Sequence, residues 1–184
     1  MSNKNVGKIF ENQFKKSVPD YCCLERFKDT AQAYNVAKTT RFTHKNPCDY
    51  LMFDSHSKIL YYFELKTTKS KSISFEDIEI DTKQSRMIHK HQIIGLVDRA
   101  KYEGVLPAFI FNFRDELTGN ERTYYQYIND FMKMYYAIKQ KKSSLNEIDL
   151  LRYNAIKIKG VKKRVHYIWD IDELLTNINQ GMRG

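Results

Sequence analysis

A nearly continuous apolar run from Val105 to Phe113 is the feature that most narrows the folds open to this chain. Successive side chains of a strand point to opposite faces, so an apolar run without alternation predicts a strand buried on both faces. Such a strand needs helices on each side of it. Helical periodicity occurs in four segments: Asn5 to Lys16, Asp81 to Tyr102, Phe131 to Lys139 and Asp170 to Ile178. The combination predicts an α/β domain with a mixed central β-sheet flanked by helices.

Further strands are predicted at Tyr21 to Phe27, Cys48 to Phe53, Ile59 to Lys66 and Arg122 to Ile128. The last of these is expected to pair with the apolar run across the turn Thr118-Gly119-Asn120. Near the C-terminus we expect a capped helical turn at Ser144 to Leu151, a hairpin centred on Gly160 within Ile156 to Trp169, and Asp170 as the N-cap of the last helix. No linker-like stretch interrupts residues 1–184, which are therefore predicted to form a single domain.

The charge of the chain points to a polyanionic partner. Thirty-one Lys and Arg residues face twenty-two Asp and Glu residues, for a formal net charge of +9. A folded domain this basic attracts nucleic acid through its long-range field. An anionic lipid surface, or no anionic partner at all, stays open on charge alone.

The cysteines and the N-terminus bear on location. Cys22, Cys23 and Cys48 have no metal-binding spacing, and they are typical of small buried side chains in a reducing compartment. The N-terminal MSNKNVGKIF lacks the apolar segment of a secretion signal, and no stretch approaches the length of a membrane span. We therefore expect no membrane partner and a cytoplasmic location, in the host cytoplasm if a phage encodes the chain.

Two carboxylates and a lysine are predicted to converge at the end of a hairpin. Glu64 and Lys66 lie two residues apart on an apolar strand, so they share a face. Asp49 begins the preceding strand. An antiparallel hairpin around Asp54 to Ser57 places Asp49 opposite Glu64, since 49 and 64 sum to the 113 that centres the turn between residues 56 and 57. Charges at the end of a buried strand are costly unless they are paired or bind a metal.

This constellation predicts a site for a hard divalent cation. Asp49 and Glu64 would hold Mg²⁺ through oxygen ligands, and Mn²⁺ is expected to substitute for it. A bound ion lowers the pKa of a coordinated water and neutralises charge on a phosphate. Lys66 would orient or deprotonate the attacking water and stabilise the transition state. A Glu-x-Lys tripeptide alone equally fits a surface ion pair.

The pattern Pro47-x-Asp49 followed by Glu64-x-Lys66 resembles the PD-(D/E)XK motif of the restriction-endonuclease-like fold. The layout from about Val6 to Phe113 is similar to the RecU family of Holliday-junction resolvases. The residues that carry the resemblance are Gly7-Lys8-x-Phe10-Glu11, Asp49, Glu64 to Lys69, Ser72 to Phe75 and His91-Gln92-Ile93.

The resemblance implies a Mg²⁺-dependent homodimer that makes paired nicks in four-way DNA junctions during recombination and repair. It also implies a basic stalk that protrudes from the sheet, an insertion at about residues 29–46, and specifically Thr30 to Lys45. This stalk is shorter than those of the bacterial enzymes, and Pro47 stands where they tend to carry Thr.

Auxiliary residues are weaker candidates. The resemblance favours Glu11 as a residue that reaches the metal or its water shell. Gln92, on the helix after Lys66, is a candidate for a hydrogen bond to the attacking water or to a phosphate. A solvated role fits each of them equally. Candidate DNA contacts are Arg26, Lys38, Arg41, Lys45, Lys69 and Lys71. His89 and His91 invite a zinc site, but on a helix two residues at this spacing point apart, which argues against it.

Other functions stay open. A nuclease for another DNA substrate, of restriction or exonuclease type, would use the same core. A non-catalytic DNA-binding protein and an RNA-binding domain are two further alternatives. The basic cluster Lys157, Lys159, Lys162, Lys163 and Arg164 fits a DNA contact, and it fits equally an edge that lysines protect from unwanted strand pairing.

Overall fold

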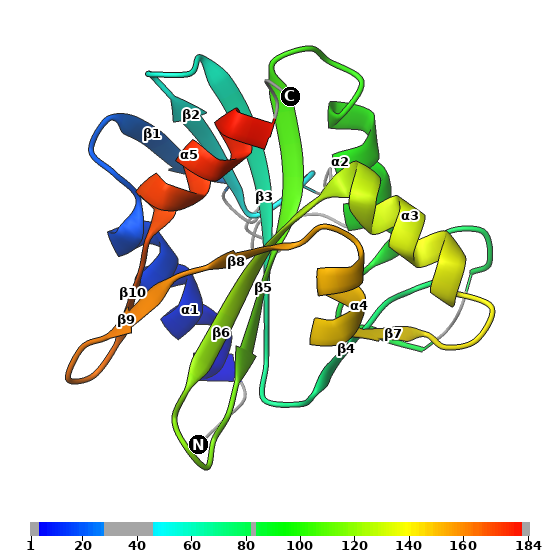
Figure 1. The fold of residues 1–184 in the computed structure, drawn as a ribbon. Coiled ribbons are helices and arrows are strands. Elements are labelled where there is room, and N and C mark those ends of the chain that lie inside the picture. Colours follow the sequence, from blue (N-terminus) through cyan, green and yellow to red (C-terminus); the bar gives the residue numbers. More distant parts are fainter. Residues whose placement is uncertain (1–3, 28–45, 82–83, 182–184) are drawn as a thin grey trace, which may run out of the picture.

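A computed structural model of the protein describes residues 4–27, 46–81 and 84–181. Its centre is a six-stranded sheet in the order β1-β2-β3-β5-β6-β8 (Figure 1). The strands are β1 (Cys22–Arg26), β2 (Tyr50–Asp54), β3 (Ile59–Thr68), β5 (Val105–Arg114), β6 (Glu121–Tyr127) and β8 (Ile156–Ile158). Strands β3 and β5 are parallel, and the other neighbours are antiparallel.

The apolar run is the central strand that the sequence predicts. β5 lies between β3 and β6, and Ala108 to Phe111 are fully buried. The mixed α/β class with a mixed central sheet is thereby confirmed. The parallel pairing of β3 with β5 requires a crossover connection, and that connection carries a helix over one face of the sheet.

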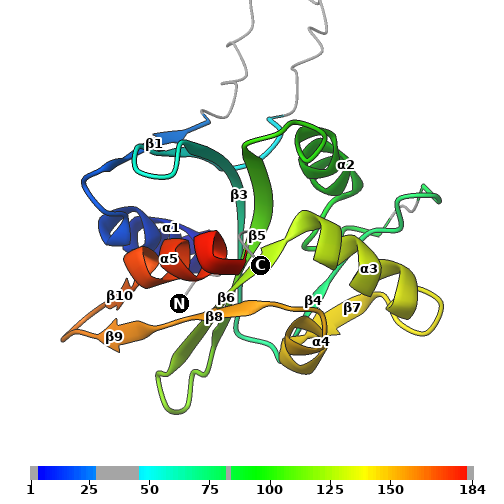
Figure 2. The same ribbon diagram turned by 45° about the horizontal axis from the view of Figure 1, so that its top comes forward.

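Helices cover both faces of the sheet (Figure 2). On one face lie α1 (Lys4–Ser17) and α5 (Ile171–Gly181), over a core that includes Phe10, Phe14, Tyr61 and Phe63. On the other lie α2 (Lys90–Arg99), α3 (Ile128–Ile138) and α4 (Glu147–Arg152), over a second core that includes Phe109, Phe111 and Phe131. Among the described residues, no helix is long and apolar enough to cross a membrane.

The helix predicted at Asp81 to Tyr102 is shorter in the structure. It begins at Lys90, because the chain before it is held by backbone hydrogen bonds to the short strand β4 (Ser72–Ser74). The amide of Ile88 donates to Ser74 O at 2.9 Å, and the amide of Glu76 donates to Ile88 O at 2.9 Å. Ile88 is fully buried there, so tertiary contact outweighs helical periodicity.

Two C-terminal predictions need correction. Ser144 to Asn146 form β7, which pairs with β4, and only then does α4 begin, capped by the Asn146 side chain.

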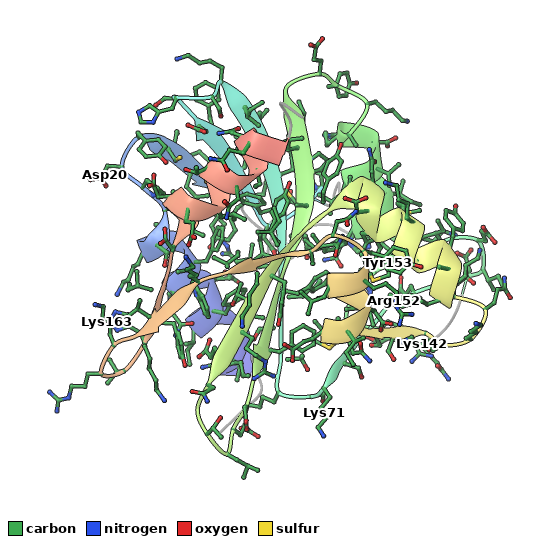
Figure 3. The ribbon with its side chains drawn as sticks, in the orientation of Figure 1. Asp20, Lys71, Lys142, Arg152, Tyr153 and Lys163 are labelled. Atoms are coloured by element: carbon green, nitrogen blue, oxygen red, sulfur yellow. The ribbon has the colours of Figure 1, made fainter. Side chains whose placement is uncertain are left out.

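The C-terminal hairpin turns several residues later in the chain than the predicted position at Gly160. β8 pairs with β6, whereas β9 (Gly160–Lys162) pairs with β10 (Tyr167–Trp169) across a turn at residues 163–166. Figure 3 shows the Lys163 side chain at that turn, pointing away from the body of the protein.

Gly160 is a packing position instead of a turn position. It lies opposite Trp169 in the β9–β10 pair, and a Cβ atom at Gly160 would come within 2.3 Å of Trp169 Cζ3. Trp169 is buried and cannot withdraw. Glycine therefore permits the close approach of the two strands.

We expect Gly160→Ala to lower the free energy of unfolding by about 1–3 kcal/mol, because the added methyl overpacks the Trp169 ring. Gly7→Ala is the matched control. A Cβ at Gly7 meets nothing within 4 Å, and alanine in a helix interior should stabilise the protein by about 0.5–1 kcal/mol. Urea unfolding of both variants measures the difference, and equal stability of the two would contradict this account of Gly160.

Candidate metal centre

Asp49 and Glu64 lie side by side at the end of the β2–β3 hairpin. Tyr50 pairs with Phe63 and Asp54 with Ile59, so partners sum to 113 as the sequence predicts. The pairing continues one step further, since the Asp49 amide donates to Phe63 O at 3.1 Å. The Asp49 carboxylate then accepts a hydrogen bond from the Leu65 amide at 2.8 Å. The predicted register is therefore confirmed.

Glu64 is a buried acid with two partners on one oxygen. Its residue is only 2% exposed. Lys66 Nζ lies 3.0 Å from Glu64 Oε1, and Gln92 Nε2 donates to the same oxygen. The sequence-predicted residues Asp49, Glu64, Lys66 and Gln92 are thus brought together.

Burial raises the pKa of the Glu64 carboxyl to about 7. The Lys66 ammonium opposes this shift, while the neighbouring Asp49 carboxylate adds to it. Two carboxylates this close repel each other when both are ionised. A divalent cation between them would remove that repulsion, so the chemistry of the donors fits a hard, oxygen-binding metal.

The start of α2 orients Gln92. Gln92 Oε1 accepts from the His89 amide at 2.9 Å, which leaves its NH₂ group directed at Glu64. Glu76 supports the same helix start, because one of its oxygens lies 2.8 Å from His89 Nδ1 and the other accepts from the Lys90 amide at 2.7 Å. Hydrogen bonds from His89 and Lys90 hold the pKa of Glu76 below its usual value, against its desolvation.

Glu76 and His89 support this site, and neither role was predicted from the sequence. The segment His89 to Gln92 has the spacing of a helix cap followed by Gln at the third helical position, which could have indicated the helix start. Glu76 lies thirteen residues before His89, with no local signal that joins them. Gly95 completes the placement of α2, since a Cβ there would lie 3.2 Å from the carbonyl oxygen of Pro47, two residues before Asp49.

His89 and His91 do not point apart. Because His89 precedes the helix with extended backbone (φ −91°, ψ 147°), its ring stacks on that of His91 with centroids 5.5 Å apart. The prediction that the two rings point apart is therefore wrong. Still, within residues 4–27, 46–81 and 84–181, no three or more His, Cys, Asp or Glu side chains form a group that could hold a metal.

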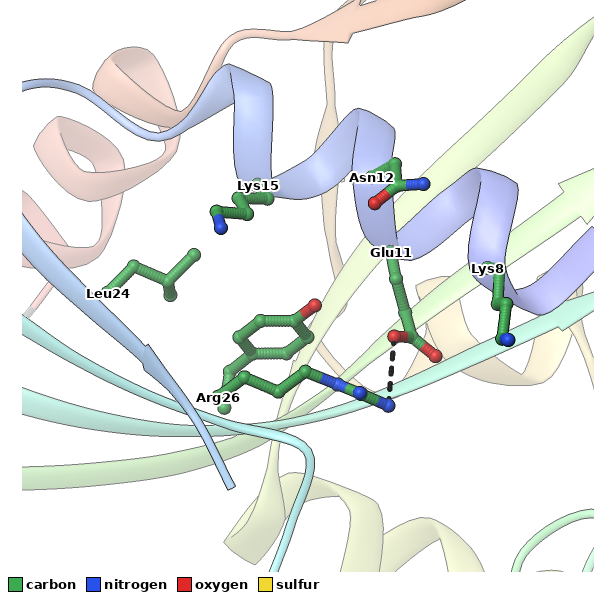
Figure 4. Close-up of a pocket in the computed structure, with 7 residues that line it drawn as sticks. Lys8, Glu11, Asn12, Lys15, Leu24 and Arg26 are labelled. Atoms are coloured by element: carbon green, nitrogen blue, oxygen red, sulfur yellow. Dashed lines mark ion pairs between the residues drawn. The ribbon is translucent and has the colours of Figure 1, made fainter. Parts of the chain in front are cut away.

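Glu11 lies on the opposite face of the sheet from Gln92. It projects from α1, on the opposite face of the sheet from α2, and its carboxylate pairs with Arg26 Nη2 at 3.2 Å (Figure 4). Both line a cavity of about 210 Å³ together with Lys8, Lys15 and Tyr50. Burial, and then the Glu11 charge, raise the pKa of Tyr50 to about 12. The described contacts of Glu11 thus join it to Arg26 and Tyr50, and its role near a metal stays a prediction.

The candidate DNA contacts are dispersed. Lys69 follows β3 and pairs with Glu116 in the β5–β6 turn, and Lys71 is exposed at the same end of the sheet (Figure 3). Arg26 pairs with Glu11 beside α1. Lys38, Arg41 and Lys45, together with the predicted stalk from Thr30 to Lys45, lie outside the described residues.

Fold and site together define a mixed α/β protein with two carboxylates and a lysine at the end of its central hairpin. No protein-family model matches the chain. It is 30% identical over 185 residues to the SPbeta prophage-derived uncharacterized protein YotM of Bacillus subtilis (strain 168), across 95% of this chain and 87% of that protein. The chain belongs to the same family as this prophage protein.

The raised pKa of Glu64 makes stability depend on pH. The folded protein keeps the Glu64 carboxyl protonated up to about pH 7, whereas the unfolded chain releases this proton near pH 4.5. The contribution of Glu64 to the free energy of unfolding is therefore fully present below pH 4.5 and is lost as the pH rises through about 7. At one pKa unit per 1.36 kcal/mol, the loss is about 3 kcal/mol. We expect Glu64→Gln to abolish this loss, so its gain in unfolding free energy over the wild type should grow between pH 4 and pH 8 in EDTA.

Glu103→Gln is the control, because Glu103 is exposed beyond the far end of α2 and undergoes the same chemical change. Urea unfolding across the pH range measures all three proteins. If Glu64→Gln and the wild type keep a constant difference between pH 4 and pH 8, the Glu64 carboxyl does not titrate as described.

Proposed function

We propose that this protein is a Mg²⁺-dependent endonuclease of restriction-endonuclease-like fold that resolves four-way DNA junctions as a homodimer. The observation that carries the proposal is the buried Glu64 carboxylate, adjacent to Asp49 and in contact with Lys66, at the end of an antiparallel hairpin. A site that only bound DNA would gain nothing from two acids placed where a phosphate approaches. The net charge of +9 supports a nucleic acid substrate.

The proposed chemistry is hydrolysis of a phosphodiester. Asp49 and Glu64 would hold the metal ion through carboxylate oxygens. When bound, the ion lowers the pKa of a coordinated water and neutralises charge on the phosphate. Lys66, held 3.0 Å from Glu64, would direct its ammonium at the attacking water and at the phosphoryl oxygens. Gln92 of α2 donates to Glu64, and it would thereby orient the carboxylate that holds the metal.

The substrate and its symmetry follow from the resemblance to junction resolvases. A twofold dimer presents two such sites, which matches the twofold symmetry of a four-way junction. The relative from a prophage supports a phage-encoded enzyme, which would act in the host cytoplasm. DNA contacts are proposed at Arg26, Lys38, Arg41, Lys45, Lys69 and Lys71, and Glu11 is proposed as an auxiliary acid.

Cleavage of a labelled four-way junction and of a matched linear duplex tests the proposal directly. We expect paired cuts near the crossover in Mg²⁺ or Mn²⁺, none in EDTA, and none with Glu64→Gln, whose junction binding in EDTA should persist. Glu103→Gln, an exposed acid away from the site, should cut as the wild type does. Equal cutting of junction and duplex would leave a nuclease with another substrate. Tight binding without cutting would refute the catalytic assignment.

Gln92→Ala tests the support from α2. We expect about a 10- to 100-fold loss of cleavage rate and a higher Mg²⁺ concentration for half-maximal rate, because the carboxylate loses its orienting partner. Gln140→Ala, an exposed glutamine after α3, is the control. Junction binding in EDTA should not change in either variant. An unchanged Mg²⁺ dependence in Gln92→Ala would argue against this role.

A further inference from the structure

The β9–β10 hairpin is a basic projection outside the candidate metal centre. Between Ile156 and Tyr167 the chain contains five Lys and Arg residues and no acid. Lys159 pairs with Glu173 of α5. In the part of the chain that the structure describes, no carboxylate pairs with Lys162, Lys163 or Arg164. These three charges are exposed at and beside the turn.

The hairpin also exposes apolar side chains among its charges. Val165 in the turn is 82% exposed, and Val161 on β9 is 58% exposed. If these lysines served only to protect the hairpin edge from unwanted strand pairing, an exposed valine in the turn would not help them. Proteins contact both the phosphates and the sugars of a nucleic acid backbone, and cations with an apolar side chain between them fit such a surface.

The hairpin is braced against the body of the protein. The Trp169 amide donates to Ser17 Oγ of α1 at 2.9 Å, and Trp169 packs on Gly160. The Tyr167 hydroxyl accepts from the Glu121 amide at 3.2 Å and donates to Gly119 O at 3.3 Å. The turn itself is closed by the Lys163 amide, which donates to His166 O at 2.7 Å. The charges are therefore presented in a fixed arrangement, which reduces the entropy lost on binding.

The β5–β6 turn lies next to the hairpin, and an ion pair joins it to the residue after β3. Lys162 Nζ lies 2.9 Å from where a Cβ on Gly119 would be, in the β5–β6 turn. Glu116 of the same turn pairs with Lys69, the residue after β3, and Lys66 lies three residues earlier on that strand. Figure 1 shows the β5–β6 turn between the end of β3 and the β9–β10 hairpin. Cations of the hairpin and of the end of β3 are therefore arranged around the same turn.

We propose that the β9–β10 hairpin is a second DNA contact, in which Lys162, Lys163 and Arg164 bind the phosphate backbone of a duplex arm and Val165 packs on its sugars. This inference rests on the proposed function for its ligand. It adds a binding surface that the metal-centre residues do not include. Its contribution should be independent of sequence, because phosphate contacts carry no base information.

The test measures duplex and junction affinity in EDTA, where no cutting occurs, over a range of salt concentrations. The test variant is Lys162→Gln, Lys163→Gln and Arg164→Gln combined. Its control combines Lys58→Gln, Lys141→Gln and Arg152→Gln, three exposed cations on other elements with the same change in net charge. We expect the test variant to lose affinity by about tenfold or more and to reduce the salt slope by about 2 to 3, at about 0.9 per phosphate contact. The control should retain the wild-type slope.

A second pair of variants covers the case in which the triple variant folds poorly. Val165→Asp places an acid at the exposed turn, and Ile148→Asp places one at a 69% exposed position on α4. We expect only Val165→Asp to weaken DNA binding. Thermal unfolding confirms the fold of each variant before binding is measured.

The outcomes separate this inference from the proposed function. If the wild type binds and cuts junctions but the hairpin variants bind DNA with unchanged affinity and slope, the inference is wrong and the nuclease stands. Self-association of the triple variant with unchanged DNA affinity would assign the lysines to edge protection. Loss of binding to anionic vesicles but not to DNA would assign them to a lipid surface. If the wild type does not bind DNA, both proposals fail.

Discussion

Burial of the Glu64 carboxylate is the constraint on which the arrangement of the candidate site depends. A charge removed from water is costly unless partners replace the lost hydration. Lys66 and Gln92 both approach one oxygen of Glu64, and Asp49 lies beside it on the neighbouring strand. The raised pKa shows that these partners compensate only in part. A hard cation is the ligand that would supply the remaining compensation at these two carboxylates.

The topology of the sheet explains why α2 supplies a partner for Glu64. β3 and β5 are parallel neighbours, and the chain between them must return to the opposite end of the sheet. α2 makes that return, so its N-terminus lies near the end of β3 where Glu64 and Lys66 stand. Gln92, in the first turn of α2, therefore reaches Glu64, and the Glu76–His89 contact fixes where that turn begins. The candidate metal centre and the crossover are one structural unit.

Two groups of basic side chains lie on the side of the sheet that α1 and α5 cover, and they differ in their pairing. Beside α1, Arg26 forms an ion pair with Glu11, and both line a cavity together with Lys8 and Lys15. On the side of α5, the β9–β10 hairpin extends a set of cations away from the sheet, and the β5–β6 turn connects it to Lys69. The similarity to the prophage relative spans 95% of the chain, so it includes both the candidate metal centre and the hairpin.

Local sequence patterns determined much of the fold and the centre of the site. Strand alternation and hairpin register act over a few residues, so they placed β5 in the middle of the sheet and Asp49 opposite Glu64. Other features depend on residues far apart in the chain. The start of α2 was set by Ile88 pairing with β4, the turn of the last hairpin by Gly160 packing on Trp169, and the support of Gln92 by Glu76. Glu11, whose helical position suggested a metal role, was placed by tertiary packing beside Arg26 on the other face. Only the tertiary structure decided these positions, because their energies come from contacts that no short-range periodicity encodes.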